Sequence, residues 1–204
     1  MTFDFFPFPL FMGIVILIIM ITILWKRKRS LAYIFCFSIF WIYILLLVKV
    51  TIFPIPFYED IRTIWTKQQV TFTLSHINLV PFKYLGFFNK YVIFREIIRN
   101  ILLTIPFGFG IRFITPFRAR NILWLAIAVG LVIEITQLVI SLGIVGVYRT
   151  VDVTDVLLNA GGVLLGYVFF KVFAWGCLTI IQRLDHKHNG LSAYIHNVAR
   201  RASE

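Results

Sequence analysis

Residues 149–166 read RTVDVTDVLLNAGGVLLG, a stretch in which polar side chains run directly into an apolar helix. Asp152, Asp155 and Asn159 follow the spacing i, i+3, i+7, which places them on one helical stripe about 10 Å long. A G-x-x-x-G pattern at positions 162 and 166 continues this stripe and lets another helix approach closely. The stretch therefore predicts a helix that starts either with a simple cap or with one wall of a polar site.

The composition excludes a soluble globular domain. Of the 204 residues, 60% are hydrophobic and the mean hydropathy is +0.89, which leaves too few polar groups to cover a water-exposed surface. Only 14% of residues are charged, yet the net charge is +11. This cationic excess indicates membrane topology and contact with anionic lipid, not nucleic-acid binding, because no polar stretch is long enough to fold as a basic soluble module.

Five apolar stretches are long enough for a spanning helix, which needs roughly 20 residues. Asp4 precedes the first stretch and KRKR (26–29) follows it, so we expect a retained anchor and not a signal peptide. Pro106 interrupts the third stretch and predicts a kink or a re-entrant turn there. The expected fold is an all-α integral membrane protein with helices at Pro9–Trp25, Leu31–Phe53, Ile97–Phe117, Ile122–Leu142 and Val153–Trp175.

Lysines and arginines in the short loops predict the orientation, since such loops tend to stay in the cytoplasm. KRKR, FRAR (117–120) and the basic C-terminal tail all fall on one side of the predicted bundle. We therefore expect an outer N-terminus and a cytoplasmic C-terminus. The segment Pro54–Glu96 then lies outside, and its aromatic and apolar run with scattered lysines is typical of chain that lies in the membrane interface.

We expect three parts in the chain: residues 1–53 with two N-terminal helices, residues 54–181 as a membrane domain, and residues 182–204 as a basic, loosely ordered cytoplasmic tail. Cys36 and Cys177 lie in apolar runs and act there as small hydrophobes. His186 and His188 have the spacing of a metal pair but lack a third ligand, so we expect them to be solvated.

Polar groups gather on one side of the predicted membrane helices. Glu134 and Gln137 lie three residues apart on one face of the fourth helix, where an ionisable group costs about 2.5–3.5 kcal/mol at mid-helix. With the orientation above, they share the outer half of the membrane with the polar residues that begin the third and fifth helices. We expect the fourth helix to pack on the G-x-x-x-G face, which brings Glu134 toward the aspartates. The predicted outward-facing cluster is Arg99, Asn100, Glu134, Gln137, Arg149, Asp152, Asp155 and Asn159, with the two arginines as the cations nearest to the acids.

Simpler interpretations exist for parts of this cluster. Taken singly, Asp152 is most simply a helix N-cap and Arg149 an interfacial anchor. The whole set also fits a structural lock between helices, because buried polar networks can fix packing without any chemistry.

Four motifs follow one another along the chain: INLVPF (77–82), RNILLTIPFG (99–108), IEITQ (133–137) and RTVDVTDVLLNAGG (149–162). In this order they resemble the VanZ-like family, named after a teicoplanin-resistance protein, and the match runs from about Asn78 to Gly166, nearly half the chain. The resemblance implies a multi-pass bacterial plasma-membrane protein associated with low-level resistance to teicoplanin-type glycopeptides or lipoglycopeptides. The matching positions are Asn78, Pro81, Arg99, Asn100, Pro106, Gly108, Glu134, Gln137, Arg149, Asp152, Asp155, Asn159 and Gly162, and Asn78 thereby joins the cluster as a ligand-binding candidate.

Three functions compete at this stage. A non-enzymatic envelope protein would use the cluster to bind the drug, an envelope lipid or a lipid-linked polymer. A membrane enzyme would use Glu134, Asp152 and Asp155 as general base or as ligands for Mg²⁺ or Ca²⁺, acting on a lipid-linked phosphate or glycan at the outer leaflet. Otherwise no metal or cofactor is expected. A transporter would need an intramembrane path, and the chain lacks the repeat symmetry and inner-half polar groups that one subunit would require.

Overall fold

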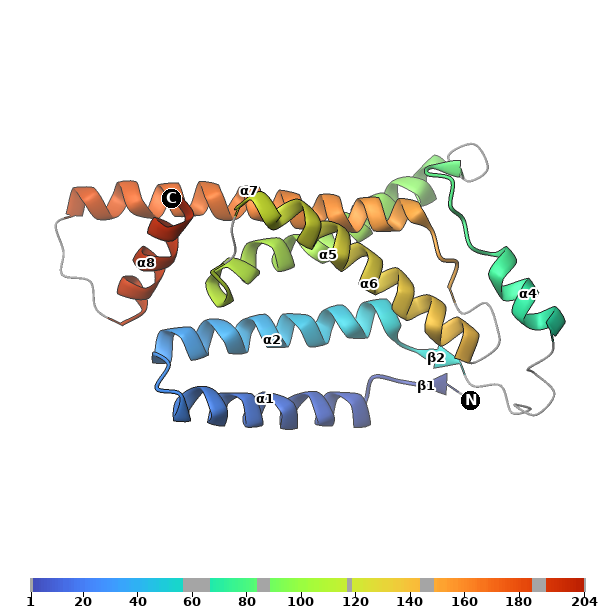
Figure 1. Ribbon diagram of the computed structural model, residues 1–204, viewed down its shortest axis with the longest axis horizontal. Coiled ribbons are helices and arrows are strands. Elements are labelled where there is room, and N and C mark those ends of the chain that lie inside the picture. Colours follow the sequence, from blue (N-terminus) through green and yellow to red (C-terminus); the bar gives the residue numbers. More distant parts are fainter. Residues whose placement is uncertain are drawn as a thin grey trace.

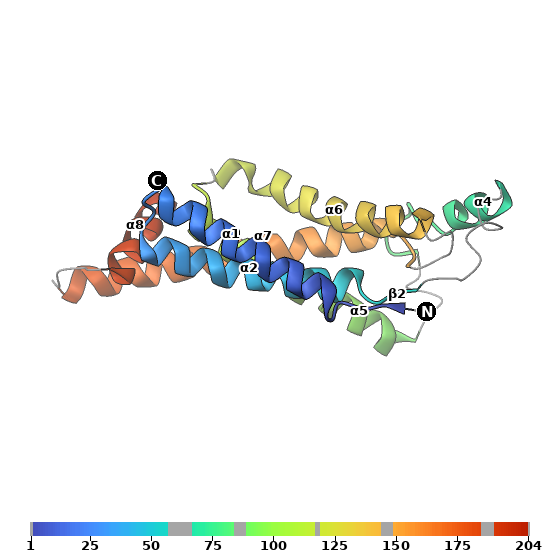
Figure 2. The ribbon, with the colours of Figure 1, turned by 90° about the horizontal axis from the view of Figure 1, so that it is seen from below.

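The computed structural model describes residues 2–56, 67–83, 89–116, 119–143, 149–184 and 190–203, and it is all-helical apart from two short strands. Five of its helices are long and apolar enough to cross a membrane, which confirms the expected fold class (Figures 1 and 2). These five are α1 (Phe8–Lys26), α2 (Leu31–Ile52), α5 (Lys90–Ile114), α6 (Ile122–Gly143) and α7 (Val153–Leu184). The shorter elements are β1 (Thr2–Phe3), β2 (Ile55–Pro56), α4 (Lys67–Ser75), the 3-10 turn η2 (Ala119–Asn121) and α8 (Leu191–Ser203).

Two of the long helices extend beyond their predicted bounds. The side chain of Asn89 accepts a hydrogen bond from Tyr91 N and begins α5 well before the expected start at Ile97. At the other extreme, α7 has 32 residues and continues past the expected end at Trp175. At 1.5 Å per residue it is about 48 Å long, so it projects beyond a hydrocarbon core of about 30 Å.

α5 and α7 pack closely through small residues. A Cβ atom added to Gly166 would collide with the carbonyl oxygen of Ile105, so the G-x-x-x-G face of α7 meets α5. The expectation that this face meets the fourth helix is therefore wrong. α6 approaches α7 through its own glycine instead, because a Cβ atom at Gly130 would lie 2.5 Å from the carbonyl oxygen of Val156.

α5 continues as one helix through Pro106, which excludes the re-entrant turn. A proline removes one backbone donor from the helix and leaves a carbonyl in the preceding turn in need of another partner. The freed carbonyl is that of Leu102, and the hydroxyl of Tyr43 on α2 donates to the next carbonyl oxygen, that of Leu103, over 2.8 Å. α2 thus supports α5 at this point.

Large apolar side chains cover the outside of the bundle. Phe94, Leu102, Val132, Val139 and Trp175 each expose more than half of their surface. In water such a coat would be unfavourable, whereas hydrocarbon is its natural solvent. Many buried residues of the same helices are small or polar, among them Ala126, Thr104 and Ser141, so close packing and hydrogen bonds contribute to holding the bundle together.

The bundle has two chemically different ends (Figure 1). At the polar end lie the N-terminus, α4, the start of α7 and the end of α6, and β1 pairs there with β2 in antiparallel register. Of the predicted outer segment Pro54–Glu96, residues 57–66 and 84–88 lie outside the described residues, while 90–96 belong to α5. At the opposite, basic end lie the α1–α2 connection, the end of α5 and α8.

The C-terminal tail is more ordered than the sequence suggests. α8 buries Val198 and Ala199 against Phe170 and Ala174 of α7. The hydroxyl of Tyr194 donates to the carbonyl oxygen of Phe113 at the end of α5. The prediction of a loosely ordered tail is wrong, because the tail carries an amphipathic helix that can bury its apolar face against the projecting part of α7.

Candidate functional site

Asp152 caps α7 and holds the incoming chain. Its Oδ1 accepts from Thr154 N at 2.7 Å, and its Oδ2 accepts from the side-chain amide of Asn78 at 2.7 Å. The backbone of Asn78 adds two bonds, from its N–H to Val151 O at 2.8 Å and from Val153 N–H to its carbonyl oxygen at 3.0 Å. Asp152 and Asn78 therefore fix the loop after α4 to the start of α7, in agreement with the capping interpretation.

Glu134 links α6 to the same helix start. Its Oε2 accepts from the backbone N–H of Asp152 at 3.1 Å, and only 3% of the residue is exposed. The first backbone N–H groups of a helix lack partners within the helix and carry a partial positive charge. A carboxylate from a neighbouring helix accepts a hydrogen bond from such an N–H group and carries the opposite charge. This explains why a carboxylate, which is costly to bury, lies within α6.

α5 contributes an amide that reaches α7. The side-chain N–H of Asn100 donates to Asp155 Oδ1 at 2.7 Å, and Asn100 is buried. One turn further along, the hydroxyl of Thr104 donates to the backbone carbonyl of Asn159 at 2.8 Å. These two bonds set the register between α5 and α7 at the point where their glycines allow close approach.

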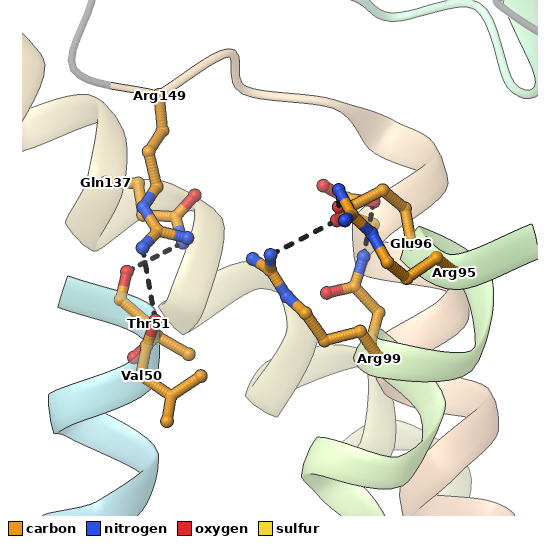
Figure 3. Close-up of polar contacts among 9 residues, drawn as sticks. Val50, Thr51, Arg95, Glu96, Arg99, Gln137 and Arg149 are labelled. Atoms are coloured by element: carbon orange, nitrogen blue, oxygen red, sulfur yellow. Dashed lines mark hydrogen bonds and ion pairs between the residues drawn. The ribbon is translucent and has the colours of Figure 1, made fainter. Parts of the chain in front are cut away.

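The end of α2 closes one side of the cluster (Figure 3). Gln137 donates through Nε2 to the carbonyl oxygen of Thr51 at 3.1 Å, and Arg149 donates through Nη2 to that of Val50 at 3.1 Å. The last carbonyls of a helix lack intrahelical partners and favour a nearby cation. Val50 and Thr51 were not predicted as site residues, because only their backbone oxygens take part and their side chains gave no signal.

Arg99 pairs with an acid of its own helix. Its Nη1 lies 3.4 Å from Glu96 Oε2, and Arg95 lies 3.6 Å from the other oxygen of Glu96 (Figure 3). The ion pair of Arg99 is therefore with Glu96, while its positive charge also acts on Asp155, in line with the expectation that Arg99 is one of the cations nearest to the acids. The i, i+3 spacing of Glu96 and Arg99 was the available signal for this pair.

These elements enclose a cavity of about 170 Å³ at the polar end. Seven of the nine predicted ligand-binding residues line it, whereas Asn78 and Asp152 belong to the cap beside it. The seven are Arg99, Asn100, Glu134, Gln137, Arg149, Asp155 and Asn159, and the remaining lining residues are Val50, Thr51, Glu96, Leu103, Ile133 and Thr150.

One acceptor in the cavity wall has no partner. Oδ1 of Asn159 is buried and has no hydrogen-bond partner among the described residues, and the whole residue is 1% exposed. An unpaired buried acceptor costs about 1–3 kcal/mol, so such groups in native proteins usually meet water or a ligand. Asn159 therefore offers the cavity an acceptor with no other use inside the protein.

The described residues contain no group of three or more His, Cys, Asp or Glu side chains placed to hold a metal ion. Glu134 and Asp155 line one cavity, but Asp152, the third acid of the enzymatic hypothesis, spends its two oxygens on the cap and on Asn78. His186 and His188 lie outside the described residues. The cavity can offer a ligand hydrogen bonds, and ion pairs with both its arginines and its carboxylates.

Comparison with known proteins supports the resemblance seen in the four motifs. The model of the VanZ/LLP1 family matches residues 40–174, which include the whole polar cluster. Neither a curated protein nor a solved structure matches the chain. Since the family model covers about two thirds of the sequence, this chain is a member of the VanZ/LLP1 family.

Proposed function

We propose that the cavity at the polar end binds the headgroup of an amphiphile in the outer leaflet of a bacterial plasma membrane. The ligand is an envelope lipid or lipid-linked polymer, or a lipoglycopeptide of the teicoplanin type, and binding limits access of the drug to its target. The observation that carries this proposal is Asn159 Oδ1, which has no hydrogen-bond partner among the described residues, in a cavity lined by nine further polar or charged residues.

The size of the cavity selects the kind of ligand. Pockets for drug-sized molecules have volumes of about 300–1,000 Å³, and 170 Å³ lies below that range. At about 30 Å³ per water molecule the cavity holds about six waters, which is the room needed by one sugar or one headgroup. A glycopeptide would therefore place a single substituent in the cavity and leave the rest of the molecule in the interface.

The lining offers complementary chemistry to such a group. The guanidinium groups of Arg99 and Arg149 suit a phosphate or carboxylate, and Arg presents several donors in one plane. The carboxylates of Glu134 and Asp155 and the amide oxygen of Asn159 suit hydroxyl or ammonium donors. A zwitterionic or sugar-phosphate headgroup satisfies both sets at once.

The proposal includes an outward-facing polar end. It rests on the lysines and arginines of the α1–α2 connection and of α8, which lie together at the basic end, where cytoplasmic loops are expected to be cationic. Single cysteines at Thr150 and Ser192, in a variant with Cys36→Ala and Cys177→Ala, test it in intact cells with a membrane-impermeant thiol reagent. Labelling at 150 and protection at 192 are expected, and the reverse pattern contradicts the orientation.

Binding is best tested with Asn159→Leu in the full-length protein in nanodiscs. This variant removes the unpaired acceptor at similar volume, so stability should be retained while binding of teicoplanin or envelope lipid, followed by calorimetry, falls about tenfold. Thr136→Val, outside the cavity lining on the exposed side of α6, is the control. Wild-type protein that binds neither teicoplanin nor any envelope lipid would refute the proposed function.

An enzymatic function is the second candidate, because Glu134 and Asp155 line the same cavity as two arginines. In that case a carboxylate would act as general base on a lipid-linked phosphate or glycan held by the guanidinium groups. Turnover of such a substrate that requires a divalent cation and disappears in Asp155→Ala would establish it. Binding without turnover by the wild-type protein favours the first proposal.

A further inference from the structure

A second pocket, at the basic end of the bundle, collects cations from three separate parts of the chain. It has a volume of about 370 Å³, and its lining includes Lys28 and Arg29 before α2, Arg112 near the end of α5, and Arg201 of α8. None of the described residues that line it is acidic. On α5, Arg112 lies 13 residues beyond Arg99, or about 20 Å along the helix, so this pocket is separate from the polar cavity.

Arg112 is the unusual member of this set. The residue is 8% exposed, and its Nε and Nη1 have no hydrogen-bond partner among the described residues. Its guanidinium lies 5.7 Å from the centre of the Phe170 ring, a contact that holds the plane of the group but satisfies none of its N–H donors. A buried guanidinium with unused donors calls for an anion with several oxygens.

Neighbouring groups favour an anion in the same place. Ser30 caps α2 by accepting from Tyr33 N at 3.2 Å, so the positive N-terminus of that helix borders the pocket. The guanidinium carbon of Arg29 lies 5.3 Å from the ring centre of Tyr33, and both residues line the pocket. Tyr194 forms part of the α8 wall, and burial raises the pKa of its hydroxyl to about 12, so it stays neutral and adds no negative charge to the pocket.

An apolar groove leads away from this pocket toward the middle of the bundle. It has a volume of about 260 Å³ and runs between α2 and α5, with Cys36, Ile39 and Phe40 on one side and Phe109 on the other. Phe113 lines both the groove and the basic pocket, so the two adjoin at this side chain. A cationic pocket at the membrane end of a helix-lined apolar groove matches the shape of one lipid molecule.

We propose that an anionic phospholipid of the leaflet at the basic end binds here, with its phosphate in the pocket around Arg112 and an acyl chain along the α2–α5 groove. The groove is the reason to favour a lipid over a soluble phosphate, since a free phosphate would leave it unused. α8, which carries Tyr194, Val198 and Arg201 to the pocket, closes the site. This proposal does not depend on what the polar cavity binds.

The test uses the full-length protein in detergent, with thermal unfolding and native mass spectrometry during addition of phosphatidylglycerol, phosphatidylcholine, glycerol phosphate or inorganic phosphate. Phosphatidylglycerol should bind about tenfold more tightly than phosphatidylcholine, as expected for a few charge-assisted hydrogen bonds. It should also raise the midpoint of thermal unfolding more than phosphatidylcholine does. Equal effects of the two lipids would overturn the proposal. Equal effects of glycerol phosphate and phosphatidylglycerol would overturn the acyl-chain part and indicate a soluble phosphate ligand.

Variants separate the two halves of the site. Arg112→Gln should lower phosphatidylglycerol affinity about tenfold, and the exposed pair Arg29→Gln with Arg201→Gln should do so even if Arg112→Gln fails to fold. Arg27→Gln is the matched control, because this neighbouring cation lies outside the pocket lining. Cys36→Phe, which places a ring in the groove, should weaken phosphatidylglycerol but not glycerol phosphate. Unchanged lipid affinity in the Arg29/Arg201 pair and in Cys36→Phe would refute the site.

Discussion

The carboxylate of Glu134 in α6 accepts a hydrogen bond from the backbone N–H of Asp152 at the start of α7, over 3.1 Å. This contact between two helices cannot be read from the sequence of either residue's own helix. Glu134 supplies a second cap to a helix of which it is not part, and Asp152 presents the donor while its own side chain holds Thr154 and Asn78. The polar cavity is built on this pair.

Glu134→Ala should destabilise the protein by about 1–3 kcal/mol, because it leaves the buried N–H of Asp152 without an acceptor. Glu134→Gln keeps an acceptor and should lose less. The midpoint of thermal unfolding in a fixed detergent measures both. Glu96→Ala is the matched control, because Glu96 is 35% exposed and its ion pairs with Arg95 and Arg99 lie at the surface. Equal losses in Glu96→Ala and Glu134→Ala would contradict the role assigned to Glu134.

Asn78 and Asp152 should behave as one unit in a double-mutant cycle. Asn78→Ala and Asp152→Ala each remove the 2.7 Å side-chain bond, so their effects on unfolding free energy should be non-additive by about 0.5–3 kcal/mol. Pairing Asp152→Ala with Asn121→Ala, at the far end of the bundle, should instead give additive losses. Additivity for Asn78 and Asp152 would mean that the loop after α4 does not depend on the cap.

Alanine substitutions at two adjacent glycines of α7 should have opposite effects on stability. Gly162→Ala should destabilise the protein by about 1–3 kcal/mol, since the new Cβ atom would collide with Thr104 and with the carbonyl oxygen of Ile101. Gly161→Ala meets nothing within 4 Å and should stabilise the helix by about 0.5–1 kcal/mol through backbone entropy. Unfolding curves of the two variants provide the comparison, and similar behaviour would argue against the α5–α7 contact.

Val198→Asp should release α8 from the bundle, because it buries a charge against Phe170 and Ala174. The expected result is rapid proteolysis and fast hydrogen exchange within residues 191–203 while the membrane helices stay protected. Asn197→Asp, an exposed position on the same helix, should leave both unchanged. Protection of residues 191–203 in Val198→Asp would show that α8 is held by other contacts.

The sequence alone determined the membrane class, the five long helices and the family, because hydrophobic length and four ordered motifs are local properties of the chain. It also grouped the polar residues correctly at one end of the bundle, since helices that alternate in direction bring a mid-helix acid such as Glu134 near the starts of its neighbours. The early start of α5 was missed because a capping side chain, Asn89, and not hydropathy, decides where that helix begins. The length of α7 past Trp175 was missed because hydropathy bounds the membrane-spanning stretch and not the helix that continues beyond it.

Only the tertiary structure decided which groups meet. Which way each helix is rotated about its axis is set by close packing, so the glycines of α7 turned out to face α5, and Gly130 of α6 met Val156. The same packing used up both oxygens of Asp152 and left Asn159 Oδ1 and the Nε and Nη1 atoms of Arg112 without a hydrogen-bond partner among the described residues. Residue types and spacing define which polar groups are available, whereas pairing and burial depend mostly on contacts between residues far apart in the chain, from 18 positions for Glu134 and Asp152 to 99 for Val50 and Arg149.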